Sequence, residues 1–146
     1  MSDPMPAGRG TRLVQRGILA VLLFGAVGTL AELALIGHNE DWWQIAPLAL
    51  LGAVIAVSAA QLARPSDRTR AALLVVMWLS IGSGALGNWL HYKGNAEFER
   101  EMYPDRAGVE LFTESMTGAT PVLAPGTMSV IGLLEVVAVW RPRGMR

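Results

Sequence analysis

Four long apolar runs, separated by polar and charged segments, set the pattern of the chain. They cover residues 17–37, 45–63, 71–90 and 127–142. A bilayer core about 30 Å thick is crossed by roughly 20 helical residues, and the first three runs reach that length. The fourth run is shorter, because the Pro-Gly pair just before it would break or kink a helix. The pattern predicts an all-α integral membrane protein with four transmembrane helices packed as a small bundle.

The segments between the runs predict little folded mass outside the membrane. Residues 1–16, with several prolines and glycines, are typical of an irregular cytoplasmic tail. The loop at 91–126 is the one sizeable extramembrane piece, and its apolar spacing predicts short amphipathic helices on the outer surface. In one of them Val109, Phe112 and Met116 share an apolar face, which we expect to face the membrane or the spans. The whole chain is therefore expected to form a single membrane domain.

The basic residues indicate how the spans are oriented. Nine of the twelve lie at the ends of spans that would share one side of the membrane, and eleven of the twelve are arginines. An excess of Lys and Arg marks the cytoplasmic side, so both termini are expected there. Trp42, Trp43 and Trp89 fall at the opposite boundary, where aromatic side chains are common. The preference for arginine over lysine is typical of GC-rich bacterial genomes. Together these patterns predict a multi-pass protein of the bacterial inner membrane.

The composition agrees with a membrane protein and excludes several chemistries. Hydrophobic residues make up 52% and charged residues 16% of the chain, whereas soluble domains carry about a quarter charged residues. Cysteine is absent, which excludes disulfides and thiolate chemistry. The sequence contains no catalytic motif, and its arginines lack the aromatic interleaving of nucleic-acid interfaces. We therefore expect no enzymatic activity, no cofactor and no nucleic-acid partner.

The stretch GSGALG at residues 82–87 fits the dinucleotide fingerprint G-x-G-x-x-G letter for letter. That fingerprint needs a preceding strand and a glycine turn ahead of a helix, whereas here it lies inside an apolar helical run. Its backbone N–H groups should be used within the helix, because lipid cannot satisfy them. We expect no nucleotide binding and interpret the stretch as a smooth helix face.

Small residues recur at four-residue spacing on two of the spans. Such faces let helix backbones approach closely, and packing there drives association in lipid. Some of the faces must serve the bundle itself, and the others are available to further membrane subunits. The residues concerned are Gly52, Ala56 and Ala60 on the second span and Ser80, Ser83, Gly84 and Gly87 on the third.

Two acidic residues, Glu32 and Glu135, lie inside spans. A charge at the bilayer centre costs about 2.5–3.5 kcal/mol, so such residues usually face protein or water. Counted from the outer boundary, the two have similar depths, and Asn88 of the third span could supply a hydrogen-bond partner. Two carboxyls held close together would not both ionise. We interpret them as neutral contacts between helices, with a proton or cation path and a contact to a partner protein or ligand as the alternatives.

His38 and His91 both fall at the outer boundary, and two carboxylates lie near the first of them. Histidine together with carboxylates can bind a divalent metal, but the spacing here matches no metal motif. Interfacial hydrogen bonding is the expected role, and no metal ligand is assigned. A membrane-embedded metal or quinone site near the two histidines stays as an alternative.

These expectations combine into one functional hypothesis. We expect a non-catalytic accessory or assembly subunit of a larger bacterial inner-membrane complex, with respiratory and photosynthetic complexes as candidates. Its partners would be other membrane subunits and lipid. The alternative from a different class is a small transporter, or a protein that handles protons or cations, using Glu32 and Glu135.

Overall fold

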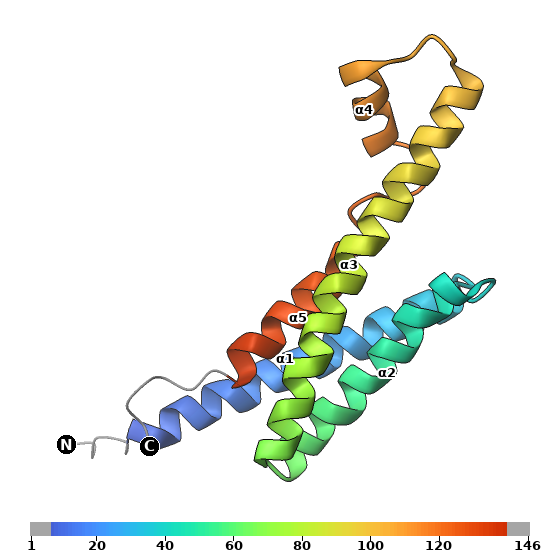
Figure 1. The fold of residues 1–146 in the computed structure, drawn as a ribbon. Coiled ribbons are helices and arrows are strands. Elements are labelled where there is room, and N and C mark those ends of the chain that lie inside the picture. Colours follow the sequence, from blue (N-terminus) through green and yellow to red (C-terminus); the bar gives the residue numbers. More distant parts are fainter. Residues whose placement is uncertain (1–6, 140–146) are drawn as a thin grey trace. The chain divides into compact units, whose positions relative to one another are not determined.

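The structure is a computed structural model that describes residues 7–139 (Figure 1). Within that range it consists of helices and their connections, without a strand, so the prediction of an all-α protein is confirmed there. The end of the fourth predicted span, residues 140–142, and the last three arginines lie outside the described residues. The helices are α1 (Ala7–Leu35), α2 (Trp42–Ala63), α3 (Asp67–Met102), α4 (Gly108–Met116) and α5 (Gly126–Val139).

Three of these helices, α1, α2 and α3, are long and apolar enough to cross a membrane. With 36 residues, α3 is about 54 Å long at 1.5 Å per residue, well beyond the thickness of a bilayer core. The 14 described residues of α5 are apolar apart from a few positions but reach only about 21 Å. Three candidate spans are therefore present in the described part of the chain, and the fourth remains a prediction.

The helix α1 starts before the first predicted span and ends inside it. Residues 7–16 were expected to be an irregular tail but are helical, because this stretch contains no proline to interrupt the backbone hydrogen bonds. At the other end Gly37 has a φ of 70°, and its N–H donates to the carbonyl of Ala34 at 3.2 Å. The N–H of His38 donates to the carbonyl of Leu33 at 2.9 Å. This pair of bonds is a Schellman motif, which gives partners to the last carbonyls and ends the helix.

Side chains cap the N-termini of α2 and α3. Asp41 accepts a hydrogen bond from the backbone N–H of Gln44 at 2.9 Å, so α2 begins at Trp42, three residues before the predicted span. The hydroxyl of Ser66 accepts from the backbone N–H of Thr69 at 3.1 Å just ahead of α3. Both caps give partners to backbone donors that the first turn of a helix leaves free.

The helix α3 does not end at Leu90, where the outer loop was expected to begin. It continues without interruption to Met102, so the first of the expected loop helices is part of α3. Residues 91–102 contain no proline, and Gly94 is their only poor helix former, so nothing in them stops the helix. Pro104, which cannot continue a helix, follows shortly after the end. The end of this helix therefore lies 12 residues beyond the end of the predicted span.

The chain forms two compact units, of which the first comprises residues 1–80 and 131–146. In its described part, α1 and α2 lie side by side as an antiparallel pair (Figure 1). A buried cluster joins Leu19 of α1, Leu73 of α3, and Ala138 and Val139 of α5. Half-buried apolar residues of α2 pack against this cluster. Segments of four helices therefore share the core of the first unit.

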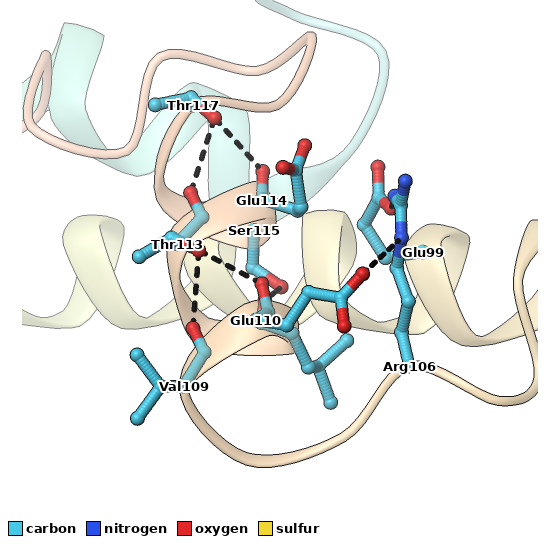
Figure 2. A network of polar contacts seen from close by, with 9 residues as sticks. Glu99, Arg106, Val109, Glu110, Thr113, Glu114, Ser115 and Thr117 are labelled. Atoms are coloured by element: carbon cyan, nitrogen blue, oxygen red, sulfur yellow. Dashed lines mark hydrogen bonds and ion pairs between the residues drawn. The ribbon is translucent and has the colours of Figure 1, made fainter.

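The second unit comprises residues 81–130. In it α4 lies beside the last turns of α3, with Leu111 and Ser115 as the buried residues of α4 (Figure 1, Figure 2). The expected apolar face of α4 is largely exposed, with Val109 at 79% and Phe112 at 52%, although the ring of Phe112 lies 5.9 Å from that of Tyr92 of α3.

Candidate functional site

Glu135 of α5 is fully buried in the core of the first unit. Its exposed fraction is 0%, and neither carboxyl oxygen has a hydrogen-bond partner among the described residues. Ser58 of α2 and Ser80 of α3, in the same unit, are equally buried, and their hydroxyl oxygens also find no partner there. Buried polar side chains are nearly always hydrogen-bonded, so three exceptions in one small core mark a candidate site.

Contacts between α3 and α5 fix the level of Glu135 in this core. The Nε of Arg70 donates a hydrogen bond to the backbone carbonyl of Val139 at 3.2 Å, and Leu73 and Val139 belong to one buried cluster. Glu135 precedes Val139 by four residues, or about 6 Å of helix. Because the two helices are antiparallel here, Glu135 lies about 6 Å beyond Arg70 along α3, in the direction of Ser80.

Ser58 and Ser80 lie on either side of the level of Glu135. A hydrogen bond from the hydroxyl of Thr69 to the side chain of Gln61 joins the start of α3 to the end of α2. Counted along α3 from Thr69, Ser58 lies at about 4.5 Å, Glu135 at about 7.5 Å and Ser80 at about 16.5 Å. Helical side chains lean toward the N-terminus of their helix, so those of Glu135 and Ser80 lean toward each other. The three polar groups therefore lie within about 12 Å of one another along α3, and no hydrogen bond joins them directly.

The structure does not bring Glu32 to Glu135. Glu32 is exposed on the outer part of α1. The buried cluster sets Leu19 of α1 beside Ala138 and Val139 of α5, which gives the register of the two helices. From that level Glu135 is about 5 Å away and Glu32 about 20 Å away in the same direction. The two acids therefore do not lie at the similar depth that was expected. That expectation placed the outer boundary of the fourth span at the first residue of the fourth apolar run.

The glycines of GSGALG have different surroundings in the second unit. A Cβ atom on Gly84 would lie 2.7 Å from the backbone nitrogen of Ser129 and 2.9 Å from the carbonyl oxygen of Pro125. A Cβ atom on Gly87 would lie 2.5 Å from the Cβ of Pro125, whereas one on Gly82 would meet nothing within 4 Å. Gly84 and Gly87 therefore form the face of α3 against which the start of α5 packs, and we call it the glycine face.

The small residues of α2 face away from the rest of the described chain. A Cβ atom on Gly52 would meet nothing within 4 Å, and Ala56 and Ala60 are exposed. From residue 46 to residue 63, every exposed residue of α2 is an alanine. We call this surface the alanine face, and it consists of Ala46, Ala49, Gly52, Ala56, Ala59, Ala60 and Ala63.

Asn88, the third polar residue expected inside the membrane, belongs to the second unit together with Ser83. Both are half-buried on α3. A Cβ atom on Gly126 would lie 3.7 Å from the Nδ2 of Asn88, so Asn88 is next to the start of α5. Its Oδ1 is buried and has no hydrogen-bond partner among the residues that the structure describes.

The two histidines have ordinary polar surroundings. The Nδ1 of His91 lies 2.9 Å from the backbone carbonyl oxygen of Pro121, which links α3 to the segment that leads to α5. His38 is half-buried in the turn after α1. Over the described part of the chain, no three His, Asp or Glu side chains gather as possible metal ligands. The alternative of a metal site near the histidines therefore gains no ligand set.

The tryptophans expected at the membrane boundary are exposed. Trp42 and Trp43 lie in the first turn of α2, with ring centroids 3.6 Å apart. In the second unit, the ring of Trp89 is 6.1 Å from Tyr92, which is in turn 5.9 Å from Phe112 of α4. Exposed aromatic groups of this kind are suited to the headgroup region of a bilayer.

Charged residues hold the turn between α3 and α4 in the second unit (Figure 2). Arg106 forms an ion pair with Glu99 of α3 and a second one, at 3.5 Å, with Glu110 of α4. Its guanidinium also lies 3.8 Å from the ring centroid of Tyr103. Desolvation lowers the pKa of Arg106, but the hydrogen bond and the Coulomb attraction of Glu99 outweigh it and raise the pKa above its usual value. Arg106 is therefore a fixed positive charge that ties α4 to α3.

Asn95 is a second connection within this unit. Its Nδ2 donates to the carbonyls of Ser115 at 2.9 Å and Thr120 at 2.8 Å, and its Oδ1 accepts from the N–H of Thr120 at 3.2 Å. Ser58 was not among the residues singled out from the sequence. For Ser58 a signal was present, because it shares a helical face with Leu51 and Val54.

The arrangement offers three features: a buried group of one acid and two serines, an open alanine face, and a loop after α3 that is held by polar contacts. None of them contains a nucleophile paired with a base. Comparisons with protein families, with curated proteins and with solved structures find no match to this chain.

Proposed function

We propose that the protein is a non-catalytic accessory or assembly subunit of a larger complex in a bacterial inner membrane, with respiratory and photosynthetic complexes as candidates. The alanine face of α2 is the observation that supports this proposal most directly. In lipid, helices associate where small residues let their backbones approach closely. A surface whose exposed positions are all alanine fits a helix of another subunit.

The exposed positions of the other long helices make the contrast clear. On α1, Phe24 is 83% exposed, and Leu35 is 88% exposed. On α3, Trp78 and Leu79 are 69% and 55% exposed. Large apolar side chains of this kind suit contact with lipid chains, and α2 presents none of them between residues 46 and 63. A helix that faced only lipid would have no reason to be restricted to alanine.

The proposal includes four spans with both termini in the cytoplasm. Three long apolar helices and the apolar α5 support the spans. Arg12, Arg16, Arg64 and Arg68 support the orientation, because they lie at the same end of the α1–α2 pair, where Arg16 bonds to the carbonyl of Leu62. The exposed apolar side of α4 would then rest on the outer surface of the membrane.

Extraction of the protein from its native membrane in a mild detergent, followed by native electrophoresis, tests the proposal. The wild-type chain should migrate with other membrane subunits, identified by mass spectrometry. Ala56→Ile adds bulk to the alanine face and should increase the free fraction at least about tenfold, which corresponds to about 1.4 kcal/mol. Ala20→Ile, at an exposed position of α1, is the matched control and should leave the complex intact.

Two results would contradict the proposal. A wild-type chain that migrates as a free monomer, with no co-purifying partner, would remove the larger complex. If the chain migrates in an assembly that contains only copies of itself, the alanine face serves self-association instead of contact with another subunit. Thermal unfolding of the isolated Ala56→Ile and Ala20→Ile variants should be similar, so that release from the complex reports on association and not on folding.

The alternative of a transporter that uses two acids is not supported by the positions of those acids. Glu32 is exposed and lies about 15 Å from the level of Glu135 along the helices. The two side chains therefore do not form a shared site in the first unit.

A further inference from the structure

We propose that Glu135, together with Ser58 and Ser80, forms a buried proton-binding site in the core of the first unit. The carboxyl group holds a proton there and exchanges it with water. The site is separate from the alanine face, so this inference does not depend on the proposed function.

Among the residues that the structure describes, no charged side chain forms a hydrogen bond with Glu135. On α2, from Trp42 to Ala63, no residue is ionisable, and neither is any residue of α3 from 71 to 80. The ionisable residues of α1 whose side chains the structure describes are Arg12, Arg16 and Glu32, and all three are exposed. The nearest cationic residue on α3 is Arg70, and its Nε is used by the carbonyl of Val139. An unpaired carboxylate in such a core would be very costly, so Glu135 binds a proton instead.

The two serines supply the groups that a protonated carboxyl needs. A carboxylic acid has one O–H donor and acceptor oxygens, and a serine hydroxyl is both donor and acceptor. Ser58 and Ser80 are fully buried on either side of the level of Glu135, and their hydroxyls have no other partner in the described chain. Where the separation is too large for a direct bond, a buried water molecule can join two such groups. The structure shows no direct hydrogen bond among the three groups, so the proposed set includes ordered water between them.

A proton fits this set better than a metal ion does. Hard cations take about six or more oxygen ligands, whereas this core offers one carboxylate and two hydroxyls. No three His, Asp or Glu side chains come together within the described residues. A proton needs one carboxyl oxygen and no cavity, so the observed packing accommodates it.

Glu135→Gln keeps the shape and the hydrogen-bonding capacity of the neutral acid, and it removes the carboxyl proton.

Infrared difference spectroscopy on the full chain in lipid nanodiscs tests the proposal. The wild-type protein should show the C=O stretching band of a protonated carboxyl at neutral pH, and the band should shift in D2O. The band should be absent in Glu135→Gln and unchanged in the matched control Glu32→Gln. In Ser58→Ala and in Ser80→Ala it should move, because a hydrogen bond to the carboxyl changes the C=O frequency.

Each opposite result would overturn the inference. A wild-type protein without the band would hold an ionised Glu135, and a band insensitive to D2O would show that the proton does not exchange. A band unaffected by both serine variants would exclude the serines from the site. A band that disappears when NaCl replaces choline chloride would assign the site to an alkali ion. The wild-type measurements in D2O and NaCl decide the points about the proton and the alkali ion even where a variant fails to fold.

Discussion

The glycine face of α3 and the alanine face of α2 have the same four-residue spacing of small residues and very different surroundings. On α3, the backbone of α5 comes so close that a Cβ atom on Gly84 would overlap it. On α2, a Cβ atom on Gly52 would meet nothing. The glycines of α3 thus lie where the backbone of another segment of the chain packs closely. The alanines of α2 lie on a surface that no other described segment covers. Spacing alone predicts a face that can pack, whereas the structure shows which face is already filled.

The largest effect is expected from closing the glycine face with a side chain. In Gly84→Val, the Cβ atom alone would overlap backbone atoms of Ser129 and Pro125, and backbone cannot move aside as a flexible side chain can. We expect a loss of about 3 kcal/mol, the upper end of the range for overpacked cores. For a chain of this size that corresponds to a fall in Tm of roughly 10 °C, measurable by thermal unfolding in detergent.

Gly82→Val is the matched control for that substitution. It lies on the same helix two residues away, is exposed, and has open space around it. Its Tm should stay within a few degrees of the wild type, because only helix propensity changes. Equal losses in the two variants would show that the glycine face is no special contact, and the contrast between the two faces would fail.

A smaller effect is expected from the hydrogen bonds that connect α3 to the end of α4 and to the segment that follows it. Asn95→Ala removes two donated hydrogen bonds and one accepted bond, to Ser115 and Thr120, and leaves buried partners unpaired. The expected cost is about 2 kcal/mol, concentrated in the second unit. Hydrogen–deuterium exchange of the α4 amides should accelerate about 30-fold.

Thr113→Ala is the control for Asn95→Ala. Its hydroxyl bonds only to carbonyls of its own helix, those of Val109 and Glu110, and the residue is exposed (Figure 2). Exchange in α4 should therefore change little in this variant. If Asn95→Ala leaves exchange in α4 at the wild-type rate, the connection between α3 and α4 does not depend on this side chain.

Hydropathy predicted the helices well because lipid leaves a long apolar segment no other way to satisfy its backbone. That argument does not extend to polar segments, where hydropathy says little about helix ends. Residues 91–102 were expected in the outer loop, with a separate short amphipathic helix, whereas α3 continues through them. Residues 7–16 were misjudged for the same reason. Polarity marks the end of a span but does not mark the end of a helix.

The candidate site was only partly predictable. Glu135 was identified because an acid inside an apolar run is unusual at any depth. Its partners could not be found in the same way, because the relation of α5 to α2 and α3 depends on packing between segments far apart in the sequence. Counting residues from the ends of the spans therefore placed Glu135 and Glu32 at the same depth. The contact between Leu19 and Val139 gives the actual register of α1 and α5, in which the two acids lie far apart.

The smallest effect on stability is expected on the alanine face, and it is the most informative about function. Gly52→Ala adds a methyl group where nothing lies within 4 Å, so the isolated protein should keep its stability within about 0.5 kcal/mol. The analogous change at the glycine face, Gly87→Ala, would bring its new Cβ 2.5 Å from the Cβ of Pro125 and should lower the Tm. Thermal unfolding of the two variants side by side measures the difference. An equally lowered Tm in both variants would mean that the alanine face packs as closely on this chain as the glycine face does, and no surface of α2 would be left for a partner.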